Sequence, residues 1–126
     1  MKIFLLTIFF LTSLYSNILQ DAIDNAPSGS TLKLPDGIYI GNIIINKPLK
    51  IVGKNKKAII DGNSLKDVIT ITSSNVILEN ITITNSGSKM YELNSAIYIN
   101  KSDNIEINNC KILNSLYGIN MSMVNN

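Results

Sequence analysis

The chain of 126 residues has no arginine, histidine or tryptophan, a single cysteine and few aromatic residues. All its basic residues are therefore lysine, and the formal net charge is only +2. Proteins that bind nucleic acid typically show arginine forks and a strongly basic stripe, so the composition argues against a nucleic-acid partner. The lone Cys110 excludes an internal disulfide framework.

The chain is instead rich in isoleucine and asparagine. Isoleucine favours pleated, half-buried strand positions. Asparagine favours turns, because it tolerates the left-handed backbone region and hydrogen-bonds its own backbone. This combination predicts many short strands joined by tight turns, in a chain long enough for one domain.

Residues 1–16 have the layout of a secretory signal peptide. A positive start, Met1-Lys2, precedes an apolar run from Ile3 to Leu11 and a polar end at Ser16. The apolar run is shorter than the roughly 20 residues of a membrane-spanning helix. We expect cleavage after Ser16 and a periplasmic mature chain, 17–126, that does not span the membrane. An uncleaved N-terminal anchor is the alternative.

An internal repeat organises the mature chain. Residues 76–86 align with residues 105–115, an offset of 29, so that Asn80 falls on Asn109. Residues 69–71 align with 97–99 and with 119–121, the second time at an offset of 22. These offsets predict a unit of about 22 residues with one insertion between Ser86 and Ser95.

Each unit contains three short alternating strands, most clearly in residues 96–100, 105–108 and 110–113. In such a repeat, each strand pairs with its equivalent one unit away rather than with its neighbour in sequence. The chain is therefore predicted to be all-β, a right-handed parallel β-helix whose coils stack at the usual strand spacing of roughly 4.8 Å.

Alternation within the strands predicts which side chains point inward. Asn80 and Asn109 fall between strands, where we expect a left-handed turn ladder joined by side-chain hydrogen bonds; ligand binding by this pair is the alternative. The expected outward positions are Thr70, Tyr98, Thr82, Lys111, Glu79 and Asn108. The expected interior ladders are Ile69, Ile97 and Ile119; Ile71, Ile99 and Met121; Val76 and Ile105; Leu78 and Ile107; Ile81 and Cys110; and Ile83 and Ile112.

Earlier residues follow the same scheme less regularly. Residues 18–26 have apolar side chains at helical spacing, which predicts a short helix covering the first coil. No such cap follows the last strand, so we expect the chain to be the N-terminal part of a longer β-helix. Expected early strands are 31–34, 43–46, 49–52 and 58–61, with turn signals at Pro35-Asp36-Gly37 and Asp61-Gly62.

An ordered set of motifs resembles a known family of exported β-helix proteins. The motifs are LQDAI at 19–23, PSGSTL at 27–32, PLKIVG at 48–53, AIIDG at 58–62, the segment 76–87, SAIYI at 95–99 and LYGI at 116–119. In this order and spacing the chain, from Leu19 to Met121, is similar to the N-terminal part of the NosD family. NosD is a periplasmic copper-binding β-helix protein of nitrous oxide reductase maturation.

The resemblance implies a role rather than a reaction. NosD proteins act with the components of an ABC transporter in the assembly of the copper centres of nitrous oxide reductase, during denitrification. The resemblance therefore implies that the chain is not an enzyme and that its partners are the ABC transporter and the reductase. It also implies that copper binds to the full-length family.

Copper ligands within the chain itself are few. Cu(I) prefers thiolate and thioether sulfur, which Cys110, Met90, Met121 and Met123 supply, whereas the imidazole that suits Cu(II) is absent. Cys110 and Met121 take positions that the alternation assigns to the core, where such residues are ordinary fillers. Met90 and Met123 alone would make a poor site. We therefore expect no copper or other cofactor site in these residues.

Two other function classes stay open on the same fold. A polysaccharide lyase or hydrolase of the pectin lyase-like type would need a catalytic cation or paired carboxylates. The acidic residues Glu79, Glu106, Asp61, Asp67 and Asp103 form no such pair in sequence, and Asn108 stands opposite Glu79, so no catalytic residue is predicted. A carbohydrate-binding or adhesion module would use outward residues such as Tyr98 or the inserted loop with Tyr91.

Overall fold

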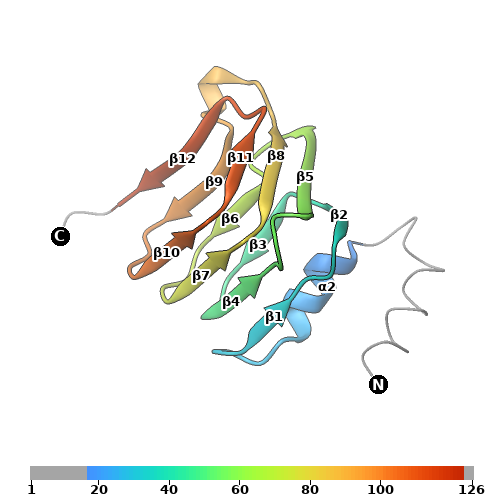
Figure 1. Ribbon diagram of the computed structural model, residues 1–126. Helices are drawn as coiled ribbons and strands as arrows, with labels where there is room; N and C mark the ends of the chain where they lie inside the picture. Colours follow the sequence, from blue (N-terminus) through green and yellow to red (C-terminus); the bar gives the residue numbers. More distant parts are fainter. Residues whose placement is uncertain (1–16, 124–126) are drawn as a thin grey trace.

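The computed structural model describes residues 17–123 as a stack of three-strand coils (Figure 1). The predicted signal peptide, residues 1–16, lies outside these residues. The predicted parallel β-helix is confirmed, because all described strands pair in parallel within three sheets of four strands each.

Sheet A contains β1 (Thr31–Lys33), β4 (Leu49–Val52), β7 (Val76–Glu79) and β10 (Ile105–Asn108). Sheet B contains β2 (Gly37–Ile40), β5 (Ala58–Leu65), β8 (Thr82–Ser86) and β11 (Lys111–Leu113). Sheet C contains β3 (Ile43–Ile45), β6 (Ile69–Ile71), β9 (Ser95–Asn100) and β12 (Tyr117–Ser122).

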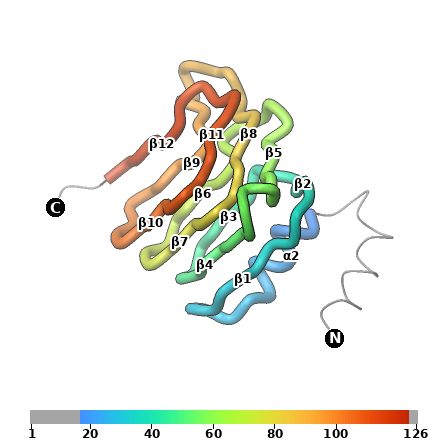
Figure 2. Tube along the Cα trace, viewed as in Figure 1, coloured from blue at the N-terminus to red at the C-terminus, as the bar shows by residue number. Residues whose placement is uncertain are grey.

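The chain visits the sheets in the order A, B, C and then starts the next coil, as the tube in Figure 2 shows. The registers match those expected from the sequence, with Val76 opposite Ile105 and Ile69 opposite Ile97. Inward isoleucine, leucine and valine side chains from the three sheets form one continuous core. Because each inward residue stacks on its equivalent, the strand register and the core packing specify each other.

The predicted helix is α2 (Ile18–Asn25), and it covers the first coil. Leu19 and Ile23 insert into the core, with exposed fractions of 2% and 0%. The Gln20 side chain replaces a missing strand at the edge of β3: its amide donates to the carbonyl oxygen of Ile44 at 3.0 Å, and its oxygen accepts from the Ile44 N–H at 2.8 Å. The helix thus covers the apolar end of the core and provides hydrogen-bond partners for part of the open strand edge.

Several expected boundaries were wrong. Strand β2 was not anticipated, because Pro35 and Gly37 suggested only a turn and two of its isoleucines are exposed. Strand β5 does not end at the Asp61-Gly62 signal but continues to Leu65 after a register shift. Thr82, expected outward, is only 5% exposed, because it lies between the flanking coils and its hydroxyl donates to the carbonyl oxygen of Lys56 at 2.7 Å.

The last described coil is less buried than the sequence suggested. Ile119 and Met121 hold the predicted register, opposite Ile97 and Ile99, but they are 46% and 57% exposed. The expectation that Met121 is a buried core residue is therefore wrong. Strand β12 has a neighbour on one side only within residues 17–123, so no described coil covers its inward side chains. Cys110 is partly buried and packs against the core, as expected.

Asparagines in the left-handed backbone region form turns at the coil corners. Asn80 and Asn109 both have positive φ, at 56° and 52°, as predicted. The predicted side-chain bond is instead found between Asn104 and Asn75, where the Asn104 amide donates at 2.6 Å. Asn80 is joined to the next coil through its backbone, since its N–H donates to the carbonyl oxygen of Asn108. Asn80 and Asn109 therefore have a structural role in their turns.

Neighbouring residues of β3 provide a test of the inward ladder. Ile45 is fully buried, whereas Ile44 is 50% exposed. We expect Ile45→Ala to lower the free energy of unfolding by about 2–5 kcal/mol, because it leaves a cavity in a packed core. Ile44→Ala is the control and is expected to cost less than about 1 kcal/mol. Urea denaturation followed by circular dichroism measures both, and equal losses would contradict the assignment of faces.

Candidate functional site

The longest connection between the described strands lies at one corner of the solenoid, where the chain passes from sheet B to sheet C. There the connections are residues 41–42, 66–68, 87–94 and 114–116. The predicted insertion between Ser86 and Ser95 is confirmed as the longest of them, and it contains the short 3₁₀ helix η1 (Met90–Glu92). Figure 1 shows this segment projecting past the ends of β8 and β9. We call residues 87–94 the inserted loop.

Hydrogen bonds fix both ends of the inserted loop to the scaffold. Gly87 donates its N–H to the carbonyl oxygen of Lys66 at 2.8 Å. The Asp67 carboxylate accepts from both the backbone N–H and the hydroxyl of Ser95, at 2.8 and 3.1 Å. Within the loop, the buried Asn94 side chain accepts from the Lys89 N–H at 3.0 Å. Asp67 is therefore an anchor of the loop rather than an isolated loop acid.

The inserted loop exposes apolar side chains despite this anchoring. Met90, Tyr91 and Leu93 are 67%, 81% and 48% exposed. Leu93 also has a left-handed backbone, with φ 53°, which is unfavourable for a residue of this type. Exposed apolar groups on a fixed loop are typical of a contact surface. We call Met90, Tyr91 and Leu93 the loop patch.

The other acidic residues named above occupy several coils, and Glu79 and Glu106 lie two residues apart in register on the neighbouring strands β7 and β10. Glu79 faces outward opposite Asn108 and forms an ion pair with Lys50 at 3.7 Å. Asp61 accepts hydrogen bonds from the Asn63 N–H at 2.8 Å and the Asn85 amide at 3.0 Å, so it shapes the bend in β5. Glu106 lies opposite Ile77, as predicted. These contacts assign structural roles to Glu79 and Asp61.

The sulfur atoms are distributed over three parts of the coil. Cys110 lies between sheets A and B, Met90 lies in the inserted loop, and Met121 and Met123 lie at the end of β12. Among residues 17–123, no three side chains of histidine, cysteine, aspartate or glutamate are grouped as metal ligands. The side chains that the sequence offered for copper therefore lie in three parts of the solenoid, with Met121 and Met123 together at the end of β12.

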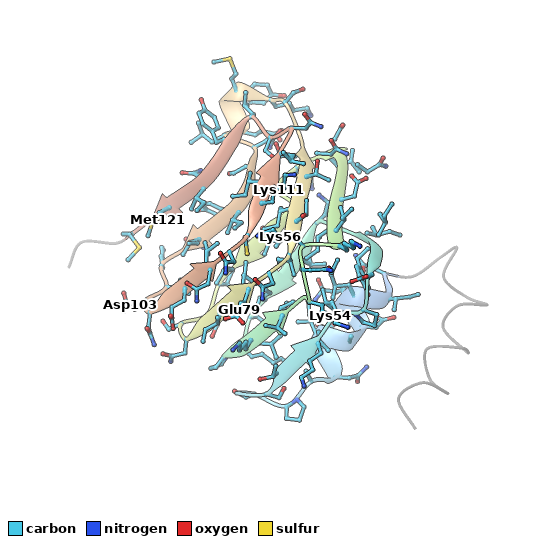
Figure 3. The ribbon with its side chains drawn as sticks, viewed as in Figure 1. Lys54, Lys56, Glu79, Asp103, Lys111 and Met121 are labelled. Atoms are coloured by element: carbon cyan, nitrogen blue, oxygen red, sulfur yellow. The ribbon has the colours of Figure 1, made fainter. Side chains whose placement is uncertain are left out.

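Sequence reasoning missed two surface features. One is the exposed Leu65, which pairs with Ser86 after the register shift in β5 and lines a hollow with Lys89 and Glu92 of the inserted loop. The other is a group of lysines where the chain passes from sheet A to sheet B, for which the KNKK run at 54–57 was the available signal. Figure 3 shows Lys54, Lys56 and Lys111 on this side of the stack.

No family model, curated protein or solved structure matches the chain. Within residues 17–123 the helices are too short and too polar to cross a membrane. The functional proposal below therefore rests on the fold, its surfaces and the sequence motifs.

The Cys110 thiol gives a test of the local electrostatics. Burial raises its pKa above the usual value, and the Glu79 charge raises it further, whereas the Lys56 charge and nearby backbone groups lower it. Because the thiolate is the reactive form, we expect slow alkylation of Cys110 at mildly alkaline pH.

The pH dependence of that alkylation rate gives the apparent pKa. Glu79→Gln should lower this pKa and Lys56→Gln should raise it, since each removes one charge of known sign. The urea-unfolded protein serves as the unperturbed control. Identical profiles for both variants and the parent would contradict the described surroundings of Cys110.

Proposed function

We propose that this protein is an exported accessory protein that works by binding other proteins and is not an enzyme. The more specific proposal is that it acts in the periplasm, with ABC transporter components, in the assembly of the copper centres of nitrous oxide reductase. The parallel β-helix fold is consistent with this role, and the motifs between Leu19 and Met121 that resemble NosD give the specific system. Export follows from the predicted signal peptide.

One observation carries the proposal: the loop patch is exposed, and hydrogen bonds join both ends of its loop to the scaffold. A surface loop without a partner gains nothing from presenting Met90 and Tyr91 to solvent. Here the anchor at Asp67 and Ser95 reduces the conformational freedom that binding would otherwise cost. A pre-ordered apolar patch of this kind favours a protein partner over a small, charged substrate.

Copper fits this proposal as the cargo of the system rather than as a resident ion of these coils. The described cysteine and methionine side chains lie at separate parts of the coil, so they offer no preformed thiolate or thioether cage. A scaffold that brings the transporter and the reductase together needs no ligand set of its own. It would contribute by positioning the surfaces that the transporter and the reductase contact.

A gene disruption in the source organism tests the specific role. We expect nitrous oxide reductase purified from the disrupted strain to contain much less copper than the parental enzyme, and the full chain supplied in trans to restore it. The readout is copper per reductase by atomic absorption. A reductase that keeps its full copper content in the disrupted strain would refute the copper-assembly role.

The loop patch has its own test in the same strain. Met90→Ser with Tyr91→Ser is expected to abolish the restoration, because it removes the apolar contact while leaving the Asp67 anchor intact. Ile38→Ser with Ile40→Ser is the matched control, since these isoleucines are 75% and 58% exposed on β2, away from the loop. Equal behaviour of the two double variants, both folded by circular dichroism, would show that the patch is not the contact.

A further inference from the structure

A hollow of about 420 Å³ lies at the corner between sheets B and C, between the irregular end of β5 and the inserted loop. We call it the loop hollow. Leu65 and Lys66 line it on the β5 side, and Lys89, Glu92 and Asn94 line it on the side of the loop. The loop hollow adjoins the loop patch, because η1 contributes residues to both.

The two sides of the loop hollow are held together by the scaffold. Leu65 pairs with Ser86 after the register shift in β5. The Gly87 N–H donates to the carbonyl oxygen of Lys66 at 2.8 Å. A Cβ at Gly87 would clash with the Asn94 amide oxygen, so glycine allows the start of the loop to approach its end this closely. The hollow is therefore formed before any partner binds.

The Glu92 carboxylate lines this hollow but is held weakly. Its Oε1 lies 3.6 Å from the Lys89 Nζ, and its Oε2 accepts from the Asn94 amide at 3.4 Å. Charge-assisted hydrogen bonds between nitrogen and a carboxylate are normally about 2.7–2.9 Å long. Asn94 is only 3% exposed, and this long contact is the one bond that its amide nitrogen donates within residues 17–123. The buried amide is thus poorly satisfied, which is costly in the absence of a closer acceptor.

Lys66 adds a second cation to the loop hollow, and it forms no ion pair with another residue of the described chain. We propose that the hollow receives an aspartate or glutamate side chain of a partner protein and that this carboxylate replaces Glu92. The incoming carboxylate pairs with Lys66 and Lys89 and accepts from the Asn94 amide at a normal distance. This inference rests on the proposed protein-binding function and names the chemistry of its partner.

An apolar side chain next to the partner's acidic residue completes the fit. Leu65 is 56% exposed on one side of the loop hollow, and the loop patch belongs to the loop on the other side. A small free anion would gain only contacts with exposed lysines, which contribute little by themselves. A protein segment gains the burial of apolar surface in addition. The surface therefore fits a segment in which an acidic residue lies beside an aliphatic or aromatic one.

Selection of random peptides displayed on phage, with the purified full chain as the target, tests this preference. The peptides are joined to the coat protein through their C-termini, so their carboxylates come from side chains. We expect the enriched peptides to carry aspartate or glutamate beside an aliphatic or aromatic residue. The most enriched peptide is then synthesised for titration by fluorescence anisotropy. Replacing its acidic residue by the corresponding amide should weaken binding roughly tenfold or more.

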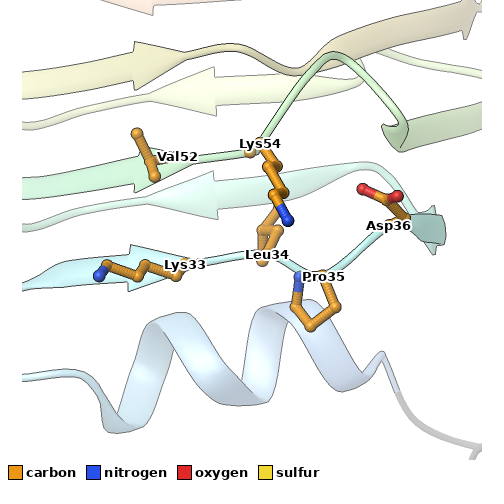
Figure 4. Close-up of a pocket in the computed structure, with 7 residues that line it drawn as sticks. Lys33, Leu34, Pro35, Asp36, Val52 and Lys54 are labelled. Atoms are coloured by element: carbon orange, nitrogen blue, oxygen red, sulfur yellow. The ribbon is translucent and has the colours of Figure 1, made fainter.

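Three variants of the chain locate that peptide. Lys66→Gln with Lys89→Gln should weaken binding roughly tenfold or more, because both cations of the loop hollow are lost. The control, Lys33→Gln with Lys54→Gln, removes the same charge at a separate pocket between sheets A and B (Figure 4) and should change the affinity less than about twofold. Glu92→Gln should instead strengthen binding about threefold or more, because it removes the competing carboxylate. Circular dichroism checks that each variant is folded.

Three results would overturn the proposal. The first is a selection that enriches no peptide, or peptides without acidic residues. The second is equal weakening by the two lysine double variants, which would mean that only net charge matters. The third is a Glu92→Gln variant that binds the peptide no more tightly than the parent. A copper-replete reductase in the disrupted strain would refute the copper-assembly role alone, since peptide binding is measured on the purified chain.

Discussion

The in-register stacking of inward aliphatic side chains is the constraint on which the rest of the structure depends. Ile43, Ile69 and Ile97 lie opposite one another in successive coils, and each is fully buried. Moving a strand by one residue would turn its buried side chains to solvent and break the ladder in all neighbouring coils. The core therefore fixes the register of the strands, and length changes in a coil fall at the corners or at an irregular strand end such as that of β5.

This constraint explains where function can be located. The connections from sheet B to sheet C range from two residues at 41–42 to the inserted loop at 87–94. The loop patch and the lysines between sheets A and B consequently lie at two different corners of the solenoid.

The sequence predicted the structural features that repeat from coil to coil and missed those that do not repeat. The ladders, the insertion and the cap helix followed from isoleucine spacing, an alignment offset and a helical apolar pattern. Strand β2 was missed because Pro35 and Gly37 suggested only a turn and because its two isoleucines, Ile38 and Ile40, are exposed. Met121 is exposed because no described coil lies beside β12 on its open side. The Gln20 side chain bonds Ile44 in the place of a neighbouring strand. Neither feature is a local property of the sequence.

The central claim is that equivalent isoleucines stack in parallel, coil upon coil. Methyl NOEs in the isotopically labelled chain test it most directly. The account predicts contacts that link Ile45 to Ile71 and Ile71 to Ile99, without the close Hα–Hα contacts of antiparallel strands. Absence of the Ile71–Ile99 contact, or strong Hα–Hα contacts between strands adjacent in sequence, would contradict the parallel β-helix.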